Sequence, residues 1–277
     1  SWANAEWFTS KRSLEKEITL TVLKIEGETN TDDLSPATHA TSRPDIPLHS
    51  LAMLETRAPE ALKIISNLKE KKHQIAYVGD VVGTGSSRKS AINSLLWHIG
   101  NEIPYIPNKK SGGVILGGKI APIFFNTAED SGALPIECDV EKLNTGDVIT
   151  IYTQEGIIKR SQEEKNAGEV ISTFNLKPLT IADEIQAGGR IPLLIGRALT
   201  DKVRSKLGLA PSKVFIRPEQ ATNNNNEFFT QAQKIVGRAC GLSGVLPGTS
   251  CEPLITTVGS QETTGPMTRD EMKELAC

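Results

Sequence analysis

Four stretches of the chain are rich in apolar and β-branched residues and predict β-strands, and in the first of them apolar and polar residues alternate with a period of about two. The clearest stretch reads Ile-Thr-Leu-Thr-Val-Leu-Lys-Ile and is rich in β-branched side chains. In another stretch the turn residues Gln-Glu-Gly separate two apolar runs, which predicts a hairpin. The four predicted segments are Ile18–Ile25, Ile75–Val78, the hairpin Val148–Arg160 and Val170–Leu176.

Elsewhere, apolar residues recur with the three-to-four-residue spacing of amphipathic helices. In one such stretch Ala61, Ile64, Ile65 and Leu68 fall on one helical face. The segment Gly112–Phe125 is different, because its glycines and apolar runs predict buried strands linked by tight turns. The predicted helices are Leu48–Thr56, Pro59–Lys69, Ser90–Ile99, a region from Ile181 onward, Phe228–Gly241 and Pro266–Ala276.

Short strands interrupted by isolated helices predict the α/β class. We expect a compact β/α (β/β/α, barrel-like) domain rather than a regular doubly wound sheet. The polar run Ala221–Asn226 cannot bury apolar surface and predicts a linker. We therefore expect a tail at residues 1–12, the main domain at 13–219, a linker at 220–227 and a truncated α/β segment at 228–277. The first residue is not Met, which suggests a piece of a longer protein.

The charge balance and the cysteine spacing narrow the classes of partner. The chain has 31 basic and 33 acidic residues, so its net charge of −2 does not favour nucleic acid as the main partner. Its apolar runs are too short to span a bilayer, and its first residues do not resemble a secretory signal. Because Cys138, Cys240, Cys251 and Cys277 lack a Cys-x-x-Cys spacing, we expect reduced thiols in a cytoplasmic protein without membrane contact.

The segment Gly79–Ser90 carries the strongest chemical signal, because a predicted strand passes through glycines into a predicted helix start. Backbone N–H groups and the positive end of a helix dipole bind anions such as carboxylate or phosphate, and Arg88 adds a bidentate donor. Arg88 also stands where a phosphate-binding loop or a dinucleotide fingerprint needs glycine, which disfavours both. A helix capped by Ser86 or Ser87 is the purely structural alternative.

Four segments resemble motifs of the aconitase family, and together they cover nearly the whole chain. Gly85–Arg88 is similar to the Gly-Ser-Ser-Arg loop of aconitases and isopropylmalate isomerases, and Thr29–Ala37 to the Thr-Asp-His-Ile-Ser-Pro-Ala loop. Ser42–Pro47 follows where the family places a substrate arginine, and Gly259–Asp270 resembles the Gln-Asp-x-Thr motif that opens its catalytic core. Their order is that of the bacterial aconitase B branch. The resemblance therefore implies a fragment with the swivel domain and the start of the core.

The resemblance implies a hydro-lyase that interconverts citrate and isocitrate through cis-aconitate in the tricarboxylic acid cycle. A 2-methylisocitrate dehydratase of propionate metabolism is the alternative within the class. By resemblance, Ser86 is the base that removes the carbon-bound proton, and Asp32 orients partners by hydrogen bonding. Glu262 stands where the family usually has Asp. The implied substrate-binding residues are Arg43, Ser87, Arg88, Gln261, Glu262 and Thr263.

The resemblance also implies a [4Fe-4S] cluster in the full-length enzyme, bound by three cysteines. The Gly-Ser-Cys-Thr-Asn type loop and the Cys-x-x-Cys pair that supply these ligands do not occur in this chain. We therefore expect no metal site here, and neither a stable cluster nor turnover without the catalytic core on which this part docks. We expect His39, His49, His73 and His98 to be structural or solvated.

Two alternatives come from other functional classes. Aconitases as a family bind RNA when the cluster is lost, so the chain could be an RNA-binding module, although its charge balance argues against strong binding. A nucleotide-binding domain would use the imperfect phosphate-binding loop around Arg88. We expect no binding of ATP.

Overall fold

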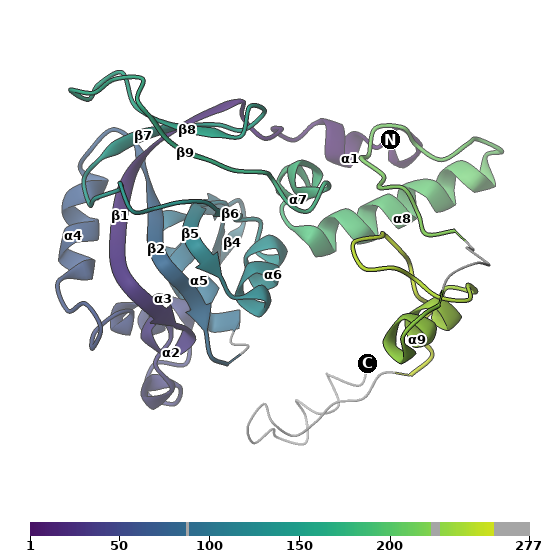
Figure 1. The fold of residues 1–277 in the computed structure, drawn as a ribbon, viewed down its shortest axis with the longest axis horizontal. Helices are drawn as coiled ribbons and strands as arrows, with labels where there is room; N and C mark the ends of the chain where they lie inside the picture. Colours follow the sequence, from purple (N-terminus) through teal and green to yellow (C-terminus); the bar gives the residue numbers. More distant parts are fainter. Residues whose placement is uncertain (87–88, 223–227, 258–277) are drawn as a thin grey trace. The chain divides into compact units, whose positions relative to one another are not determined.

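The computed structural model describes residues 1–86, 89–222 and 228–257. The chain divides into two compact units, Ser1–Ile216 and a smaller one that begins at Arg217. The larger unit is built around a seven-stranded sheet with the order β6-β5-β2-β1-β7-β8-β9, and β3 and β4 form a separate hairpin (Figure 1). In the described ranges, no helix is long and apolar enough to cross a membrane.

The sheet is mixed. β1, β2, β5 and β6 run parallel to one another, and β7, β8 and β9 continue beyond β1 as antiparallel strands. Helices connect the parallel strands, so the predicted α/β class is confirmed. The strands are β1 (Glu17–Asn30), β2 (Gln74–Thr84), β3 (Asn101–Ile103), β4 (Ile106–Ser111), β5 (Val114–Ile120), β6 (Leu134–Glu137), β7 (Val148–Tyr152), β8 (Ile157–Arg160) and β9 (Val170–Thr173).

Several of the helices are a single turn, and most of these lie in the connection between β1 and β2. The α-helices are α1 (Glu6–Thr9), α2 (Thr31–Leu34), α3 (Ile46–His49), α4 (Ala61–Lys69), α5 (Lys89–Ile99), α6 (Pro122–Asp130), α7 (Ile181–Ala187), α8 (Arg190–Lys206) and α9 (Gln231–Ala239). Short 3-10 helices are η1 (Trp2–Asn4), η2 (Ala37–His39) and η3 (Ser50–Ala52).

The two faces of the sheet pack against separate cores, because successive side chains of a strand point to opposite faces. On one face, Leu23 of β1 and Tyr77 of β2 pack with Ile65 of α4, Leu95 of α5 and Phe124 of α6. The other core contains residues of the sheet, of the segment after β6 and of α7, among them Leu20, Val22, Val78, Leu116, Val140, Leu143, Ile149 and Ile181. Helices α4, α5 and α6 therefore cover one face only.

The first residues of the chain pack on α8. Ala5, Phe8, Leu193 and Phe215 are buried together in a third, smaller core. Trp7 lies beside it, and its indole N–H donates to a threonine hydroxyl of α8 at 2.9 Å. This contact places the N-terminal segment within the larger unit.

In the smaller unit, α9 begins with a capping box, in which the Thr230 and Gln233 side chains each bond the other residue's backbone N–H. Its glycines allow close packing, because a Cβ on Gly237 would lie 2.4 Å from Gly244 Cα. The predicted helix Phe228–Gly241 is thus present, with shorter bounds.

The predicted hairpin, the strand near Val170 and the helices after residue 180 are confirmed, but the predicted ends of the strands Ile18–Ile25 and Ile75–Val78 are wrong. Glu26–Asn30 continues β1, and Gly79–Thr84 continues β2. The two segments bond to each other in parallel register, and β2 is also paired with β5 on its other side. Strand pairing therefore overrides the low strand propensity of the glycines and polar residues.

Two further predictions are corrected. Leu48–Thr56 is not one helix but the end of α3, then η3 and a turn, because Leu54 adopts a left-handed φ of 63° that ends any helix. Gly112–Phe125 holds one strand, β5, and the start of α6, where Pro122 occupies the first helical turn.

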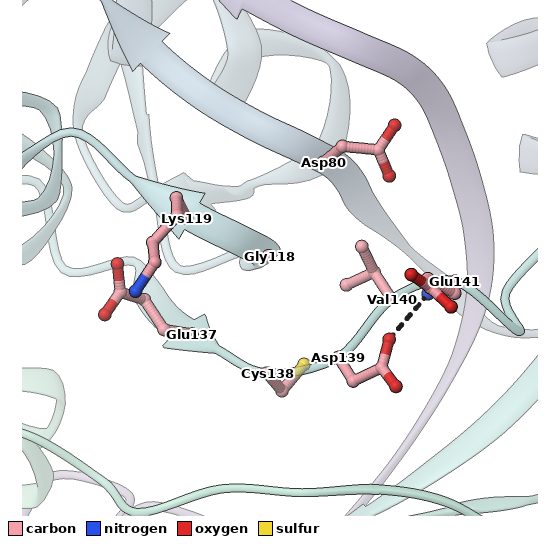
Figure 2. A pocket seen from close by; sticks show the side chains of 8 residues that line it. All are labelled: Asp80, Gly118, Lys119, Glu137, Cys138, Asp139, Val140 and Glu141. Carbon is pink, nitrogen blue, oxygen red and sulfur yellow. Dashed lines mark hydrogen bonds between the residues drawn. The ribbon is translucent and has the colours of Figure 1, made fainter.

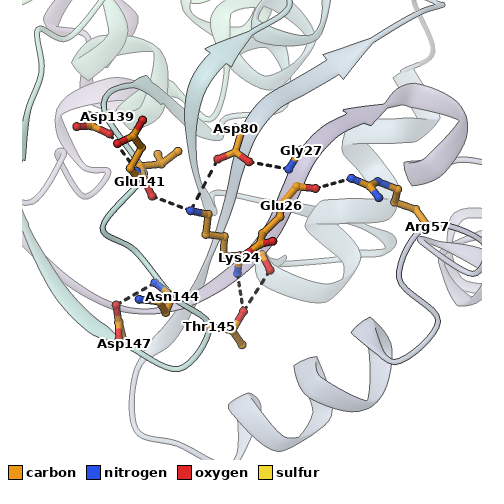
Figure 3. A network of polar contacts seen from close by, with 11 residues as sticks. Lys24, Glu26, Gly27, Arg57, Asp80, Asp139, Glu141, Asn144, Thr145 and Asp147 are labelled. Carbon is orange, nitrogen blue, oxygen red and sulfur yellow. Dashed lines mark hydrogen bonds and ion pairs between the residues drawn. The ribbon is translucent and has the colours of Figure 1, made fainter.

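A β-bulge in β1 sets the direction in which this strand leaves the sheet. The register with β2 shifts between Ile25 and Glu28, and Gly27 takes a φ of 74°. The Gly27 N–H donates to Asp80 Oδ2 at 2.6 Å, and Arg57 donates to the Glu26 carbonyl at 2.5 Å (Figure 3). Arg57 also donates to the Glu28 carbonyl at 3.2 Å. The bulge is therefore held from two sides.

Candidate functional site

The two loops that the sequence selects leave the sheet side by side. Asn30 at the end of β1 pairs with Thr84 at the end of β2 in parallel register. The next residues of both strands therefore emerge at the carboxyl edge, where open α/β sheets bind their ligands. A Cβ built on Gly85 would lie 3.3 Å from Thr31 Oγ1, so the loops pass close to each other.

Ser86 is exposed in the bend between β2 and α5. Gly83 and Gly85, with φ of 78° and 90°, bring the chain to it. A Cβ on Gly83 would lie only 2.1 Å from Phe124 Cγ, so only glycine fits there without movement of α6. Because β2 extends through Thr84, the imperfect phosphate-binding motif is divided between strand and loop, which argues against a nucleotide site.

Asp32 and Asp33 have different roles at the start of α2. The Asn30 side chain accepts from the Asp33 N–H at 2.8 Å, and Asp33 Oδ2 accepts from the Asn30 N–H at 2.9 Å. This capping box makes Asp33 the structural residue. Asp32 is exposed, and its carboxylate accepts from the Ala37 N–H at 3.4 Å.

Arg43 follows η2 and borders a cavity of about 240 Å³, which we call the arginine cavity. Its Nη1 is buried, and in the described part of the chain it has no hydrogen-bond partner. A buried charged donor without an acceptor is costly, so the cavity favours a ligand with an anionic oxygen. The other lining residues are Ser35, Pro36, Ala37, Ala40, Pro44, Ile46, His49 and Ser90.

Sequence reasoning missed three polar residues of the arginine cavity. Ser35 Oγ lies 2.8 Å from His49 Nε2 and 2.7 Å from Ser90 Oγ, and His49 Nδ1 lies 3.1 Å from the Arg43 carbonyl oxygen. Ser35 belongs to the Ser-Pro-Ala part of the resembling motif and could have been selected from it. Nothing in the sequence marks the roles of His49 and Ser90.

A second cavity, of about 460 Å³, lies at the carboxyl ends of β2, β5 and β6 (Figure 2). Lys24 beside it is already engaged, since its ammonium donates to the Val140 carbonyl at 3.0 Å and lies 3.7 Å from Asp80 Oδ1. The carboxylates exceed the single lining lysine, so this cavity repels a polyanion and the arginine cavity is the better anion site. Its lining residues are Asp80, Gly118, Lys119, Glu137, Cys138, Asp139, Val140 and Glu141.

The three cysteines within the described ranges do not form an iron-sulfur site. Cys138, Cys240 and Cys251 are free thiols, and in the ranges that the structure describes no group of three or more His, Cys, Asp or Glu side chains could hold a metal ion. Burial raises the pKa of the Cys138 thiol to about 11, which opposes the thiolate form that a cluster needs.

Five of the predicted site residues lie outside the described ranges. They are Ser87, Arg88, Gln261, Glu262 and Thr263, and the predicted helix Pro266–Ala276 lies there too. Of the remaining three, Arg43 borders the arginine cavity, while Asp32 and Ser86 lie in the two loops at the same sheet edge.

The fold and the site define a class: a mixed α/β domain that places an arginine and a glycine-serine loop at the carboxyl ends of parallel strands. The chain belongs to the family described as the aconitate hydratase 2 N-terminus, whose family model matches residues 20–228.

The chain is similar over its whole length to proteins named aconitate hydratase B. It is 69% identical to that of Synechocystis sp. over 277 residues and 56% identical to that of Escherichia coli over 287 residues. It covers 31% and 33% of these proteins, so it spans about a third of the length of its curated relatives. A solved 3-isopropylmalate dehydratase of Methanocaldococcus jannaschii superposes with a TM-score of 0.46 at 20% identity, over 69% of this chain and 99% of that one.

Proposed function

We propose that this chain is the substrate-gripping part of an aconitate hydratase, a hydro-lyase that interconverts citrate and isocitrate through cis-aconitate. The observation that carries the proposal is the buried Nη1 of Arg43, which has no hydrogen-bond partner among the described residues and borders a cavity at the same sheet edge as Ser86. A tricarboxylate supplies the anionic oxygen that this donor lacks. Membership in the aconitate hydratase 2 family supports the reaction class.

In this proposal Arg43 clamps one carboxylate, and Ser87 and Arg88 hold another. The planar guanidinium donates two parallel hydrogen bonds, which fixes the orientation of the carboxylate as well as its position. Ser86 removes the carbon-bound proton, and the N–H groups at the start of α5 together with Arg88 stabilise its alkoxide. Asp32, at the neighbouring loop, orients the groups around the serine by hydrogen bonding.

The remaining parts of the proposed site lie in the catalytic core. Gln261, Glu262 and Thr263 are proposed to face the substrate from the start of this core, at 228–277. The swivel domain, at 13–219, is proposed to dock on the part of the core that lies outside this chain. A [4Fe-4S] cluster held by cysteines outside this chain would supply the Lewis acid. We therefore propose that the isolated chain is inactive. Its free thiols support a reducing, cytoplasmic compartment.

Replacement of Arg43 by lysine in the complete protein tests this function. Lysine keeps the charge but loses the paired donors, so we expect kcat/KM for isocitrate to fall by about 10- to 100-fold, mainly through KM. Steady-state kinetics with citrate, isocitrate and 2-methylisocitrate measures the effect. The same kinetics also tests the alternative of a 2-methylisocitrate dehydratase, because a methyl group in an apolar pocket changes kcat/KM by roughly 10- to 200-fold.

The matched control is Arg57→Lys, because Arg57 bonds the β1 bulge and does not border the arginine cavity. We expect its KM to equal that of the parent. Unchanged kinetics in Arg43→Lys would remove the basis of the proposal. RNA binding with a steep salt dependence would instead favour the regulatory alternative, which the net charge of −2 does not support.

A further inference from the structure

A chain of three hydrogen bonds joins the Arg43 loop to the first turn of α5 through His49. His49 Nδ1 lies 3.1 Å from the Arg43 carbonyl oxygen, and Nε2 lies 2.8 Å from Ser35 Oγ. Ser35 Oγ in turn lies 2.7 Å from Ser90 Oγ. His49 is 6% exposed and Ser35 is 2% exposed, so water cannot readily replace these bonds.

The chemistry of the groups assigns a donor to each bond. A carbonyl oxygen only accepts, so the Nδ1–H of His49 donates to Arg43. In the neutral ring Nε2 is then an acceptor, and the Ser35 hydroxyl donates to it. Ser35 Oγ can consequently accept from the Ser90 hydroxyl. One tautomer of His49 thus satisfies all three bonds.

The two ends of this series of hydrogen bonds lie in the two halves of the proposed substrate site. Arg43 borders the arginine cavity, and Ser90 is the second residue of the helix that follows the Ser86 loop. A separate bond, from His98 Nε2 of α5 to the Ser50 carbonyl at 2.9 Å, holds the far end of the helix to η3. The body of α5 is therefore anchored independently, and the hydrogen bonds through His49 act on its first turn.

We propose that His49, which also lines the arginine cavity, is a positioning residue that fixes Arg43 relative to the first turn of α5 through these bonds and does not act on the reacting atoms. The inference rests on the proposed function, because it assumes that Arg43 and the Ser86 loop grip one tricarboxylate. A displacement of about 1 Å in a substrate-holding group costs on the order of 100-fold in rate. Loss of these three hydrogen bonds is therefore expected to raise KM through Arg43 and to lower kcat through the Ser86 loop.

The test is His49→Phe in the complete protein, which keeps a ring but removes both nitrogens. We expect kcat/KM to fall by about 10- to 100-fold, with contributions from both constants. His49→Gln should recover part of the loss, because its amide can still accept from Ser35. Ser90→Ala removes only the outermost bond at an accessible helix start. We expect it to lower kcat/KM roughly fivefold even if His49→Phe does not fold.

The matched control is His73→Phe. His73 bonds Glu163 at 3.1 Å and precedes β2 at the amino end of the sheet, opposite the site, so we expect parental kinetics. If Arg43→Lys raises KM while His49→Phe and Ser90→Ala keep parental constants, the inference is overturned and the proposed function stands. If kcat/KM falls in His49→Phe but does not recover in His49→Gln and does not fall in Ser90→Ala, His49 only fills space and the inference is also overturned. Parental kinetics in Arg43→Lys would instead overturn the proposed function.

Discussion

At the residue scale, Gly83 shows how closely the sheet and α6 confine the Ser86 loop. Alanine there would combine a φ of 78° with a Cβ 2.1 Å from the Phe124 ring. We expect Gly83→Ala to lower the free energy of unfolding by about 2 to 4 kcal/mol, as measured by urea denaturation. Gly208→Ala is the matched control, because its φ is 69° but nothing lies within 4 Å, so only about 1 kcal/mol of backbone strain is expected. Equal losses in the two variants would contradict the packing argument.

The same scale separates what the sequence could predict about the site from what it could not. Arg43, Asp32 and Ser86 lie in contiguous motifs, and a motif is readable without knowledge of the fold. The bonds of Ser35 to His49 and to Ser90 join residues 14 and 55 positions apart, so only the folded chain brings them together. The predicted roles of the residues outside the described ranges stay predictions.

At the element scale, the β1 bulge depends on Asp80, which accepts from Gly27 and lies near the Lys24 ammonium. The Lys24 side chain is only 10% exposed, so removal of its partner leaves a charge in a poorly hydrated place. We expect Asp80→Ala to destabilise the chain by about 1 to 3 kcal/mol in urea denaturation, and Asp80→Asn by less, since the amide oxygen still accepts from Gly27.

Asp139→Ala is the control for this prediction, because the Asp139 residue is exposed and, among the contacts drawn in Figure 3, its carboxylate accepts only a local bond from the Glu141 N–H at 3.0 Å. We expect a change of less than about 0.5 kcal/mol there. If Asp80→Ala were as mild as this control, the bulge would not depend on the carboxylate.

Element type was easier to predict than element length. The apolar residues at the start of β1 and β2 are a local signal, and they predict both strands. Their last residues are glycines and polar groups, which remain extended because neighbouring strands bond to them. The sequence therefore predicts the start of the loops after β1 and β2 several residues too early. The pairing of the strands in the sheet decides where each loop begins.

At the scale of the whole larger unit, the contact of α6 with α7 and α8 contains two glutamates that are each 3% exposed. Burial, followed by the Glu184 charge, raises the pKa of Glu129 from 4.5 to about 7, although Arg190, whose Nη1 lies 3.5 Å from its carboxylate, lowers it. Burial also raises the pKa of Glu184, and neighbouring Asp130 acts in the same direction on both. This helical contact is therefore most stable when a proton is bound.

The sign of the pH dependence follows from this shift. Between pH 4.5 and about 7 the folded chain keeps a Glu129 proton that the unfolded chain has released, so the stabilisation is complete below pH 4.5 and decreases as the pH rises to about 7. At about 1.4 kcal/mol per pKa unit, the loss is at most about 3 to 4 kcal/mol. Glu129→Gln, an uncharged mimic of the protonated acid, should remove this decrease in urea denaturation between about pH 5 and pH 8, whereas Glu155→Gln at the exposed β7–β8 turn should keep it. If the free energy of unfolding of Glu129→Gln decreased with pH as steeply as in the parent, the pH dependence would arise from other groups. The contact of α6 with α7 and α8 would then not depend on this proton.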